Sequence, residues 1–341
     1  MFARFAWLLL LMAGYAGMRL SAQISGLRPA PLVQMPRQVD SNSPALWRDG
    51  EYIIFNSAGK PVVSRGAGPV GPFRSREITV DRDDHQPMWM EAAWQDADGA
   101  IYAWYHHEPG GLCSDSDLTA PQIGAMVSYD GGDIFYDLGL ILTSGDPIDC
   151  SAENGFFGSG HGDFSVILDR EGRYFYFLFG NYGGEASEQG VAIARMAFED
   201  RINPAGVVWK YYHGSWHEPG LGGHVSPVFP AGVSWKEADT DAYWGPSIHW
   251  NTYLESYVVL MSRSCCRPNW PQEGVYISFN TDLANPYGWT LPERILERPS
   301  AYYPQVLGAG PGETDTVAGQ VARLHLQGKS QWEIVFRKTE P

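Results

Sequence analysis

Carboxylate side chains at the starts of strand-like segments are the residues of this sequence best placed to do chemistry. Asp163 follows three glycines and a histidine in "GSGHGDFSVIL", and Glu91 holds the matching place in "MWMEAAW". A positioned carboxyl group can act as a general acid or base, whereas a carboxyl group in a loop commonly caps a turn. Because local motif and repeat position agree at Asp163, we predict a site residue there; for Glu91 both roles stay open.

Two further carboxylates are catalytic candidates. For each of them the simpler alternative is a capped turn or a solvated loop. Asp40 lies three residues before Ser43, where a strand is about to begin. Glu218 lies in the glycine-rich segment "SWHEPGLGGH", and the same "HEPG" occurs at His107–Gly110. Acid–base chemistry needs one protonated and one ionised group, so two such acids near one axis would suffice.

Histidine and tryptophan side chains accompany these acids. His85, His161 and His224 each precede a strand-like segment. Imidazoles beside a carboxylate are ordinary metal ligands, but the sequence holds no compact motif such as His-Glu-x-x-His, so we expect contacts to ligand hydroxyls and no metal. Trp244 and Trp270 have Gly, Pro and Cys as neighbours, which favours a ligand-facing position over the alternative of core filling.

The elements that must position these residues are short β-strands. Helical periodicity is almost absent, and runs rich in β-branched and aromatic residues alternate with Gly, Pro, Asn and Asp turns. Four segments repeat a polar start, an apolar strand, a polar turn and an aromatic-rich strand. They are "SNSPALWRDGEYIIF", "WMEAAWQDADGAIYAWY", "HGDFSVILDREGRYFYFLF" and "YWGPSIHWNTYLESYVVLM", and a fifth unit starts with "YYPQVLG".

This repeat predicts the fold class. Further strands follow each unit, so we predict an all-β protein, a five-bladed β-propeller with four-stranded antiparallel blades. The uneven spacing of the units predicts long loops on one face. A β-sandwich built from hairpins is the alternative.

The N-terminus has the pattern of a secretory signal peptide. Arg4 precedes the apolar run "FAWLLLLMAGYAG", and "LSAQ" offers a cleavage site after Ala22. The run is short for a membrane span, which needs ~20 apolar residues. We therefore expect residues 1–22 to be the signal, residues 23–341 to form a single propeller domain, and the mature protein to be secreted or periplasmic.

Charge and motifs exclude several classes of function. The formal net charge of −15 argues against nucleic acid and against anionic membranes, both of which need basic patches. No phosphate-binding loop and no nucleophile elbow occurs in the sequence.

The four cysteines are compatible with disulfides in an exported protein. Cys113, Cys150, Cys265 and Cys266 allow three connectivities. We favour Cys113–Cys150 together with a ring between the adjacent Cys265 and Cys266; reduced or cross-paired thiols are the alternative. A closed ring in "SCCRPNW" would stiffen its turn and present Arg267, Asn269 and Trp270 to a ligand.

The blade pattern over residues 36–310 resembles the five-bladed propeller glycoside hydrolases of the family 43 type. In that family, blade one supplies a general base Asp, blade three a carboxylate that tunes the acid, and blade four a general acid Glu. Asp163 in "DFSVILDREGRYFY" matches the blade-three position. Ser43 stands where the base should be and Trp244 where the acid should be, so the sequence departs at two of three catalytic positions.

The resemblance implies a monomeric, carbohydrate-active protein whose partner is an oligo- or polysaccharide. It implies no cofactor beyond a structural calcium ion, which this propeller class can hold in its central channel. Glycoside hydrolysis needs two carboxyl groups, and neither serine nor tryptophan supplies one. We expect a glycosidase in which Asp163, Glu91, Asp40 or Glu218 supplies the acid and base. The alternatives are a glycan-binding propeller that has lost both, and a structural module of the cell envelope.

Overall fold

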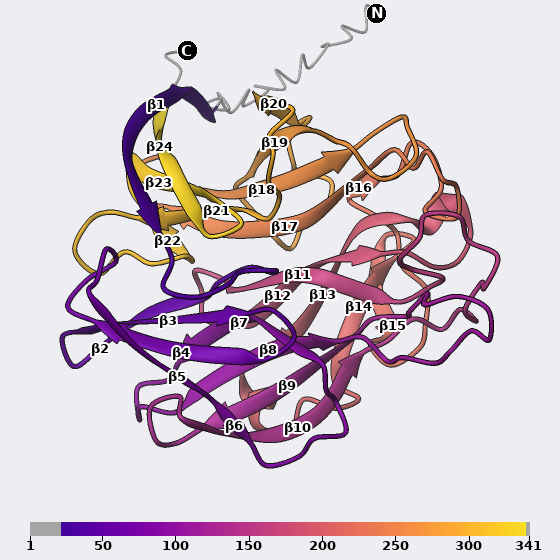
Figure 1. Cartoon of the computed structure of the whole chain (residues 1–341), viewed down its shortest axis with the longest axis horizontal. Helices are drawn as coiled ribbons and strands as arrows, with labels where there is room; N and C mark the ends of the chain where they lie inside the picture. Colours follow the sequence, from indigo (N-terminus) through magenta and orange to yellow (C-terminus); the bar gives the residue numbers. More distant parts are fainter. Residues whose placement is uncertain (1–21, 339–341) are drawn as a thin grey trace, which may run out of the picture.

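The computed structural model describes residues 22–338, which form five β-sheets arranged as blades around one axis (Figure 1). The five-bladed propeller predicted from the repeats is confirmed. The predicted signal peptide lies outside the described residues except for Ala22. Helix in the described range is limited to two short 3₁₀ turns, η1 (Ala186–Glu188) and η2 (Phe198–Ile202). No helix between residues 22 and 338 is long and apolar enough to cross a membrane.

Each blade is ordered from an inner strand at the axis to an outer strand. Blade 1 contains β2 (Ala45–Arg48), β3 (Glu51–Ser57), β4 (Pro61–Gly66) and β5 (Phe73–Glu77). Blade 2 contains β7 (Met88–Gln95), β8 (Ile101–His107), β9 (Gln122–Ser128), β10 (Ile134–Leu142) and β6 (Thr79–Val80). Blade 3 contains β11 (His161–Leu168), β12 (Tyr174–Asn181), β13 (Gly190–Ala197), β14 (Val208–Tyr212), β15 (Ser215–Pro219) and β16 (Phe229–Pro230).

The last two blades complete the ring. Blade 4 contains β17 (Ala242–Asn251), β18 (Ser256–Ser264), β19 (Gln272–Asn280), β20 (Glu293–Glu297) and β22 (Val317–Ala318). Blade 5 contains β21 (Pro304–Gly308), β23 (Val321–Leu326), β24 (Lys329–Lys338) and β1 (Ala22–Gln34). Blades 2, 3 and 4 therefore exceed the predicted four strands, because segments of connecting loops add strands to their sheets. Among these, β16 pairs with β13, and β22, from the β21–β23 connection of blade 5, pairs with the inner strand β17.

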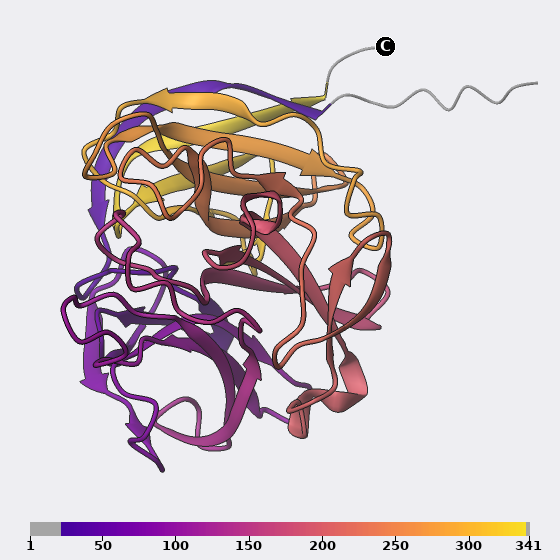
Figure 2. The ribbon, with the colours of Figure 1, turned by 90° about the vertical axis from the view of Figure 1, so that its right-hand side faces the viewer.

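Strand β1 closes the ring by pairing with β24 as the outermost strand of blade 5. Both views show this first strand, in indigo, beside the yellow strands that end the chain (Figure 1 and Figure 2). The pairing covers an edge that β24 would otherwise expose. It also joins the two ends of the described chain in one sheet.

The two faces of the propeller differ in the length of their connections. On one face, short turns join the inner strand to the second strand, and Gly50, Gly99 and Gly172 supply left-handed φ values of 82°, 91° and 66° in blades 1 to 3. On the other face the connections are longer. This face, which we call the loop face, comprises residues 35–44, 108–121, 143–160, 182–189, 265–271 and 298–303.

One side chain, Asn42, joins three blades at the axis on the loop face. Its Nδ2 donates hydrogen bonds of 2.8 Å to the carbonyl oxygens of Phe164 in β11 and Pro246 in β17. Its backbone N–H donates to the Glu91 carboxylate of β7 at 3.4 Å. Asn42 is only 1% exposed, so water cannot replace these donors.

The repeated segments predict five equivalent positions at the starts of the inner strands: Ser43, Glu91, Asp163, Gly245 and Pro304. In the structure each lies within three residues of the first residue of its inner strand, at the loop face. The inner strands of blades 3 and 4 each have an irregular pairing at this point, with Asp163 and Gly245 at φ of 42° and 56°. In blade 5 the matching left-handed residue is Tyr303, at 52°, one residue before the expected position.

Replacing Asn42 by alanine should destabilise the propeller strongly. Two buried carbonyl groups would lose their donor, and each such loss costs about 1–3 kcal/mol, so we expect a decrease of about 2–4 kcal/mol in the free energy of unfolding. Urea unfolding followed by tryptophan fluorescence measures it. Asn203→Ala, at an exposed position, is the control and should stay within about 0.5 kcal/mol of the wild type. If Asn42→Ala unfolded at the same urea concentration as the wild type, the hydrogen bonds of Asn42 between blades would be dispensable.

Candidate functional site

Three titratable side chains from blades 2 and 3 meet at the axis. Glu91 of β7, His106 of β8 and Asp163 of β11 are buried, and one nitrogen or oxygen atom of each lies within 4.8 Å of the others. A hydrogen bond of 2.5 Å joins His106 Nδ1 to Glu91 Oε1. We call these three residues the central cluster. The structure thus brings together two acids that the sequence indicated and a histidine that it did not.

The local backbone explains why both acids point inward. Strand pairing is interrupted between Met90 and Ala92 in β7 and between Gly162 and Phe164 in β11, so Glu91 and Asp163 are the extra residues of two bulges. A bulge bends the strand and redirects one side chain. The glycine before Asp163 is required because a Cβ at that position would lie 2.8 Å from Pro121.

Asp163 is a buried bridge between blades. Its Oδ2 accepts a 2.6 Å hydrogen bond from Tyr182 Oη, and its Oδ1 accepts a 2.8 Å hydrogen bond from Tyr303 Oη. Burial raises the pKa of Asp163, while the positive charge of His106 and the two tyrosine hydrogen bonds oppose the rise. Both carboxylate oxygens are therefore engaged by the protein, which leaves Asp163 poorly placed to contact a ligand directly.

His106 provides the positive charge of the central cluster. Its ring stacks on Trp89 with centroids 4.9 Å apart, and its Nε2 lies 3.5 Å from the Glu108 carboxylate. Burial alone would lower the pKa of His106, but the hydrogen bonds to Glu108 and Glu91 outweigh it and raise the pKa to about 10. Burial raises the pKa of Glu91, and the bond to His106 opposes that rise.

Two carboxylates form an outer layer that solvent reaches. Asp40 is partly exposed and accepts a 3.3 Å hydrogen bond from Tyr302 Oη, and the side chain of Glu108 is 28% exposed. Burial and the negative charge of Asp163 raise the pKa of Asp40, although hydrogen bonds from Tyr302 and Trp89 oppose this. Of the four acids near the axis, Asp40 and Glu108 are the ones available to a ligand.

The two positions at which the sequence departs from the family 43 pattern are closed. Ser43 is fully buried, and its hydroxyl accepts a hydrogen bond from Asn56 Nδ2 at 3.0 Å. Trp244 is 4% exposed, and its indole Nε1 donates to Ser264 Oγ at 2.9 Å. Neither position holds an acid, and neither leaves room for one to act.

Aromatic side chains surround Trp244. This aromatic cluster contains Phe157, Tyr182, Trp235 and Trp244, with Trp270, Tyr302 and Tyr303 packed against it. The ring of Trp270 lies 4.5 Å from that of Trp235 and 5.0 Å from that of Phe156, which is 55% exposed. Of the two tryptophans expected to face a ligand, Trp244 is thus buried and Trp270 is partly exposed.

The remaining candidates lie away from the central cluster. His161 is buried beside Phe179, and His85 bonds to Asp137 and Tyr105 in blade 2. His224 is exposed and faces Glu188 at 3.1 Å.

Glu218 lies on β15, at the outer side of blade 3, where its Oε2 accepts a hydrogen bond from the His224 backbone. The structure therefore does not bring Glu218 to the axis. The acid of the other "HEPG" segment, Glu108, is the one near it, because that segment directly follows an end of β8 on the loop face.

The donor set of the central cluster does not suit calcium. Calcium takes about 6–8 oxygen ligands. The four carboxylate oxygens of Glu91 and Asp163 already accept hydrogen bonds from His106, Asn42, Tyr303 and Tyr182. A protonated imidazole beside them would also repel a cation.

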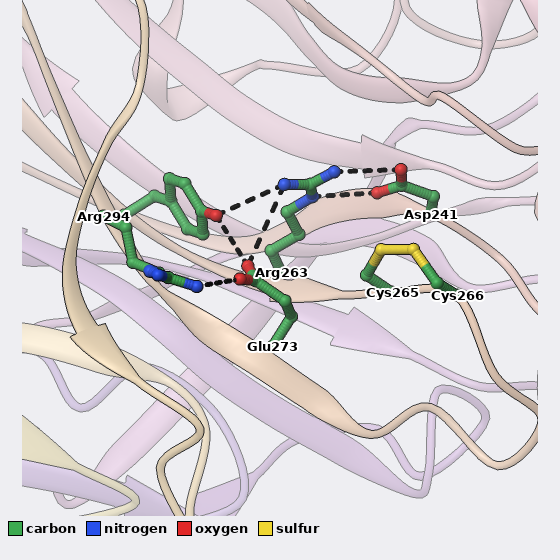
Figure 3. Close-up of a disulfide and its surroundings, with 7 residues drawn as sticks. Asp241, Arg263, Cys265, Cys266, Glu273 and Arg294 are labelled. Carbon is green, nitrogen blue, oxygen red and sulfur yellow. Dashed lines mark hydrogen bonds and ion pairs between the residues drawn. A yellow bond between two sulfur atoms is a disulfide. The ribbon is translucent and has the colours of Figure 1, made fainter.

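Both favoured disulfides are present in the structure. Cys113–Cys150 joins residues 108–121 to residues 143–160, two connections of the loop face. Cys265–Cys266 forms a ring directly after β18 (Figure 3). Since Ser264 pairs with Ala242, the first residue of β17, this ring also lies on the loop face.

A cavity of about 670 Å³ adjoins Asp40 at the loop-face end of blade 5. We call it the blade 5 cavity. Its lining includes the residues directly before Asp40 and Tyr302 and the turn between β23 and β24. Four glutamines, one tryptophan and two cations stand out among them: Gln34, Gln38, Gln327, Gln331, Trp332, Arg37 and Lys329. The backbone N–H of Gln327 donates to the Tyr302 carbonyl at 2.7 Å, so the cavity is tied to the residue that bonds Asp40.

Comparisons with known proteins find solved structures with a similar fold, but no match at the level of sequence. No protein-family model and no curated protein matches the chain. The chain is similar to the solved structure of a point mutant of an α-L-arabinanase from Cellvibrio cellulosa, with 13% identity, a TM-score of 0.54, and coverage of 87% of this chain and 92% of that one.

Two further solved structures agree. An α-L-arabinofuranosidase from Lactobacillus brevis has 13% identity and a TM-score of 0.53 over 89% of this chain and 92% of its own. A thermostable family-43 glycoside hydrolase has 12% identity and a TM-score of 0.50 over 91% and 96%. The resemblance to family 43-type propellers is confirmed at the level of the fold, which is all that such identities establish.

The ion pair of the central cluster predicts a pH-dependent contribution to stability. The folded pKa of His106, about 10, exceeds its ordinary value of 6.5. Burial raises the pKa of Glu91 to about 7, so the two opposite charges coexist above that pH, and stabilisation by the protonated ring is lost as the pH rises through 10. We expect the difference in unfolding free energy between wild type and His106→Asn to shrink across that window in urea titrations. His213→Asn, at an exposed left-handed position that asparagine tolerates, is the matched control. A pH-independent difference would exclude the ion pair.

Proposed function

We propose that the protein is an exported propeller that binds an oligosaccharide or polysaccharide on its loop face without hydrolysing it. The observation that carries this proposal is the blade 5 cavity beside Asp40. Amide and carboxylate groups form hydrogen bonds with sugar hydroxyls, and an indole face packs against the C–H face of a sugar ring. Gln38, Gln327 and Trp332 supply amide and indole groups around this cavity, and the carboxylate of Asp40 follows Val39, a residue of its lining.

The arrangement of the acids supports binding over hydrolysis. Glycosidases hold two carboxyl groups ~5–5.5 Å or ~6.5–9.5 Å apart across the scissile bond. One oxygen of Glu91 lies within 4.8 Å of one oxygen of Asp163, and both carboxylates are buried and hydrogen-bonded to protein groups, which leaves no access for a scissile bond between them. Ser43 and Trp244 cannot replace them.

Hydrolysis remains the second candidate because of one specific observation. Asp40 is partly exposed, and burial together with the charge of Asp163 raises its pKa, as a general acid requires. Glu108 is the second acid with access to solvent near the axis. In a hydrolase, Asp40 would protonate the leaving oxygen and Glu108 would activate water.

Binding and hydrolysis are separated by one panel of soluble polysaccharides, assayed by affinity electrophoresis and by product analysis. We expect retention by at least one polysaccharide without release of sugar. Trp332→Ala should weaken that retention about tenfold, as expected for losing ~1.4 kcal/mol of aromatic contact. Trp209→Ala removes a 43% exposed tryptophan from the outer part of blade 3 and should leave retention unchanged.

Two results would decide against this proposal. If no polysaccharide is retained, the glycan-binding function is wrong. If sugar is released by the wild type and not by Asp40→Asn or Glu108→Gln, the second candidate is correct. Circular dichroism of each variant confirms that the fold is intact.

A further inference from the structure

We propose that the Cys265–Cys266 disulfide is the floor of a second sugar subsite that selects a sugar carrying a negative charge, such as a carboxylate or a sulfate ester. This inference rests on the proposed glycan-binding function and adds the class of glycan. It is carried by a cavity of about 480 Å³ lined by the disulfide, Arg267, Gln272, Glu273 and Arg298. We call it the disulfide cavity.

A network of ion pairs holds the strands beneath the disulfide cavity. Arg263 of β18 makes two hydrogen bonds to the Asp241 carboxylate, at 2.8 Å and 2.9 Å (Figure 3). On the other side of Arg263, the Glu273 carboxylate of β19 accepts hydrogen bonds from Arg294 of β20 and from Tyr276. Two acids are thus balanced by two guanidinium groups, so Glu273 does not act as a free negative charge in the cavity.

The two other arginines of the cavity are not balanced in this way. Arg267 is exposed and makes no side-chain hydrogen bond or ion pair with any residue of the described range 22–338. Arg298 has only a 4.0 Å contact with Glu297, and both side chains are well exposed, which gives a weak pair. Two arginines without a strong ion-pair partner therefore line this cavity, in a chain whose net charge is −15. An anionic ligand is the natural complement.

An unpaired polar atom provides an independent indication of a ligand. The amide of Gln272 donates through Nε2 to Ser264 Oγ at 3.3 Å, but its Oε1 is buried and has no donor among the residues that the structure describes. Buried acceptors without a partner are uncommon in native proteins and call for an explanation. Gln272 lines the disulfide cavity, so a turn of its side chain toward the cavity would bring this acceptor to a sugar hydroxyl.

The disulfide itself provides the apolar part of the subsite. Sulfur is soft and polarisable, so two adjacent sulfur atoms offer a small surface for the C–H face of a sugar ring. The ring also lies in a loop of unusual backbone geometry, in which Cys266, Asn269 and Trp270 have φ of 70°, 68° and 49°. Such residues cost on the order of 1–3 kcal/mol each and are found mainly at functional sites. A loop held in one conformation loses less entropy on binding.

The disulfide cavity and the blade 5 cavity are neighbours on the loop face. Arg298 lines the first and Ser300 lines the second, only two residues along the chain. Ser264 Oγ also accepts hydrogen bonds from both Gln272 and Trp244, which connects the disulfide loop to the aromatic cluster. One glycan chain can therefore occupy both cavities, with its charged sugar over the disulfide.

Isothermal titration calorimetry with three probes tests the subsite: soluble galactan, polygalacturonate oligosaccharides, and sulfated galactan. We expect at least one anionic probe to bind the wild type about tenfold more tightly than galactan at low salt, with the advantage lost at high salt. Arg267→Gln with Arg298→Gln should remove most of this advantage, so that the anionic probe binds about as tightly as galactan does. Cys265→Ser with Cys266→Ser, or reduction of the wild type, should weaken the anionic probe.

The outcomes separate this inference from the function on which it rests. Trp332→Ala should weaken all probes that bind, whereas the arginine variants should remove the difference in affinity between anionic and neutral probes. If galactan binds as tightly as both anionic probes, or if the arginine variants keep the anionic preference, the subsite is refuted while glycan binding stands. If no probe and no polysaccharide of the panel binds, both proposals fail. The arginine variants change only exposed side chains, so the test holds even where the cysteine variants unfold.

Discussion

The hydrogen bonds of the Asn42 amide are the interaction on which this propeller depends. The inner strands of blades 3 and 4 are irregular where they reach the axis, and an irregular strand leaves carbonyl groups without partners. One amide group supplies donors to both of these carbonyls, and the backbone of the same residue reaches Glu91. The axis on the loop face is consequently filled by protein, and a ligand must lie outward of it, over the blades.

The closed axis determines how the charges of the central cluster are balanced. Glu91 and Asp163 are enclosed with Asn42, so their charges cannot be solvated and must be balanced within the protein. His106 supplies the balancing charge, and two tyrosine hydroxyls saturate Asp163. The same geometry that makes these acids essential to the fold removes them from contact with a ligand. Only the partly exposed acids of the outer layer, Asp40 and Glu108, keep that capacity.

The fold could be predicted from the sequence because it is encoded locally. Strand periodicity, glycine turns and a repeated order of segments all report on neighbouring residues, and the inner positions follow from the repeat. The contacts of the site are not local. Asn42 in "SNSP" looks like a turn residue, and His106 in "AWYHH" looks like part of an apolar strand, yet they meet Glu91 from 49 and 15 residues away. The two "HEPG" segments are identical in sequence, and only the fold places Glu108 near the axis and Glu218 at a blade edge.

The positions of the disulfides fit the proposed binding of a glycan on the loop face. The loop face is built from long connections that few sheet hydrogen bonds restrain, and both disulfides lie there. Trp244, at the position of the missing acid, fills the space beneath the disulfide loop and bonds to Ser264, at the start of that loop. Trp244 therefore also supports the loop that carries the disulfide cavity. A surface ordered in this way can hold a glycan through preformed contacts, for which no carboxylate pair is needed.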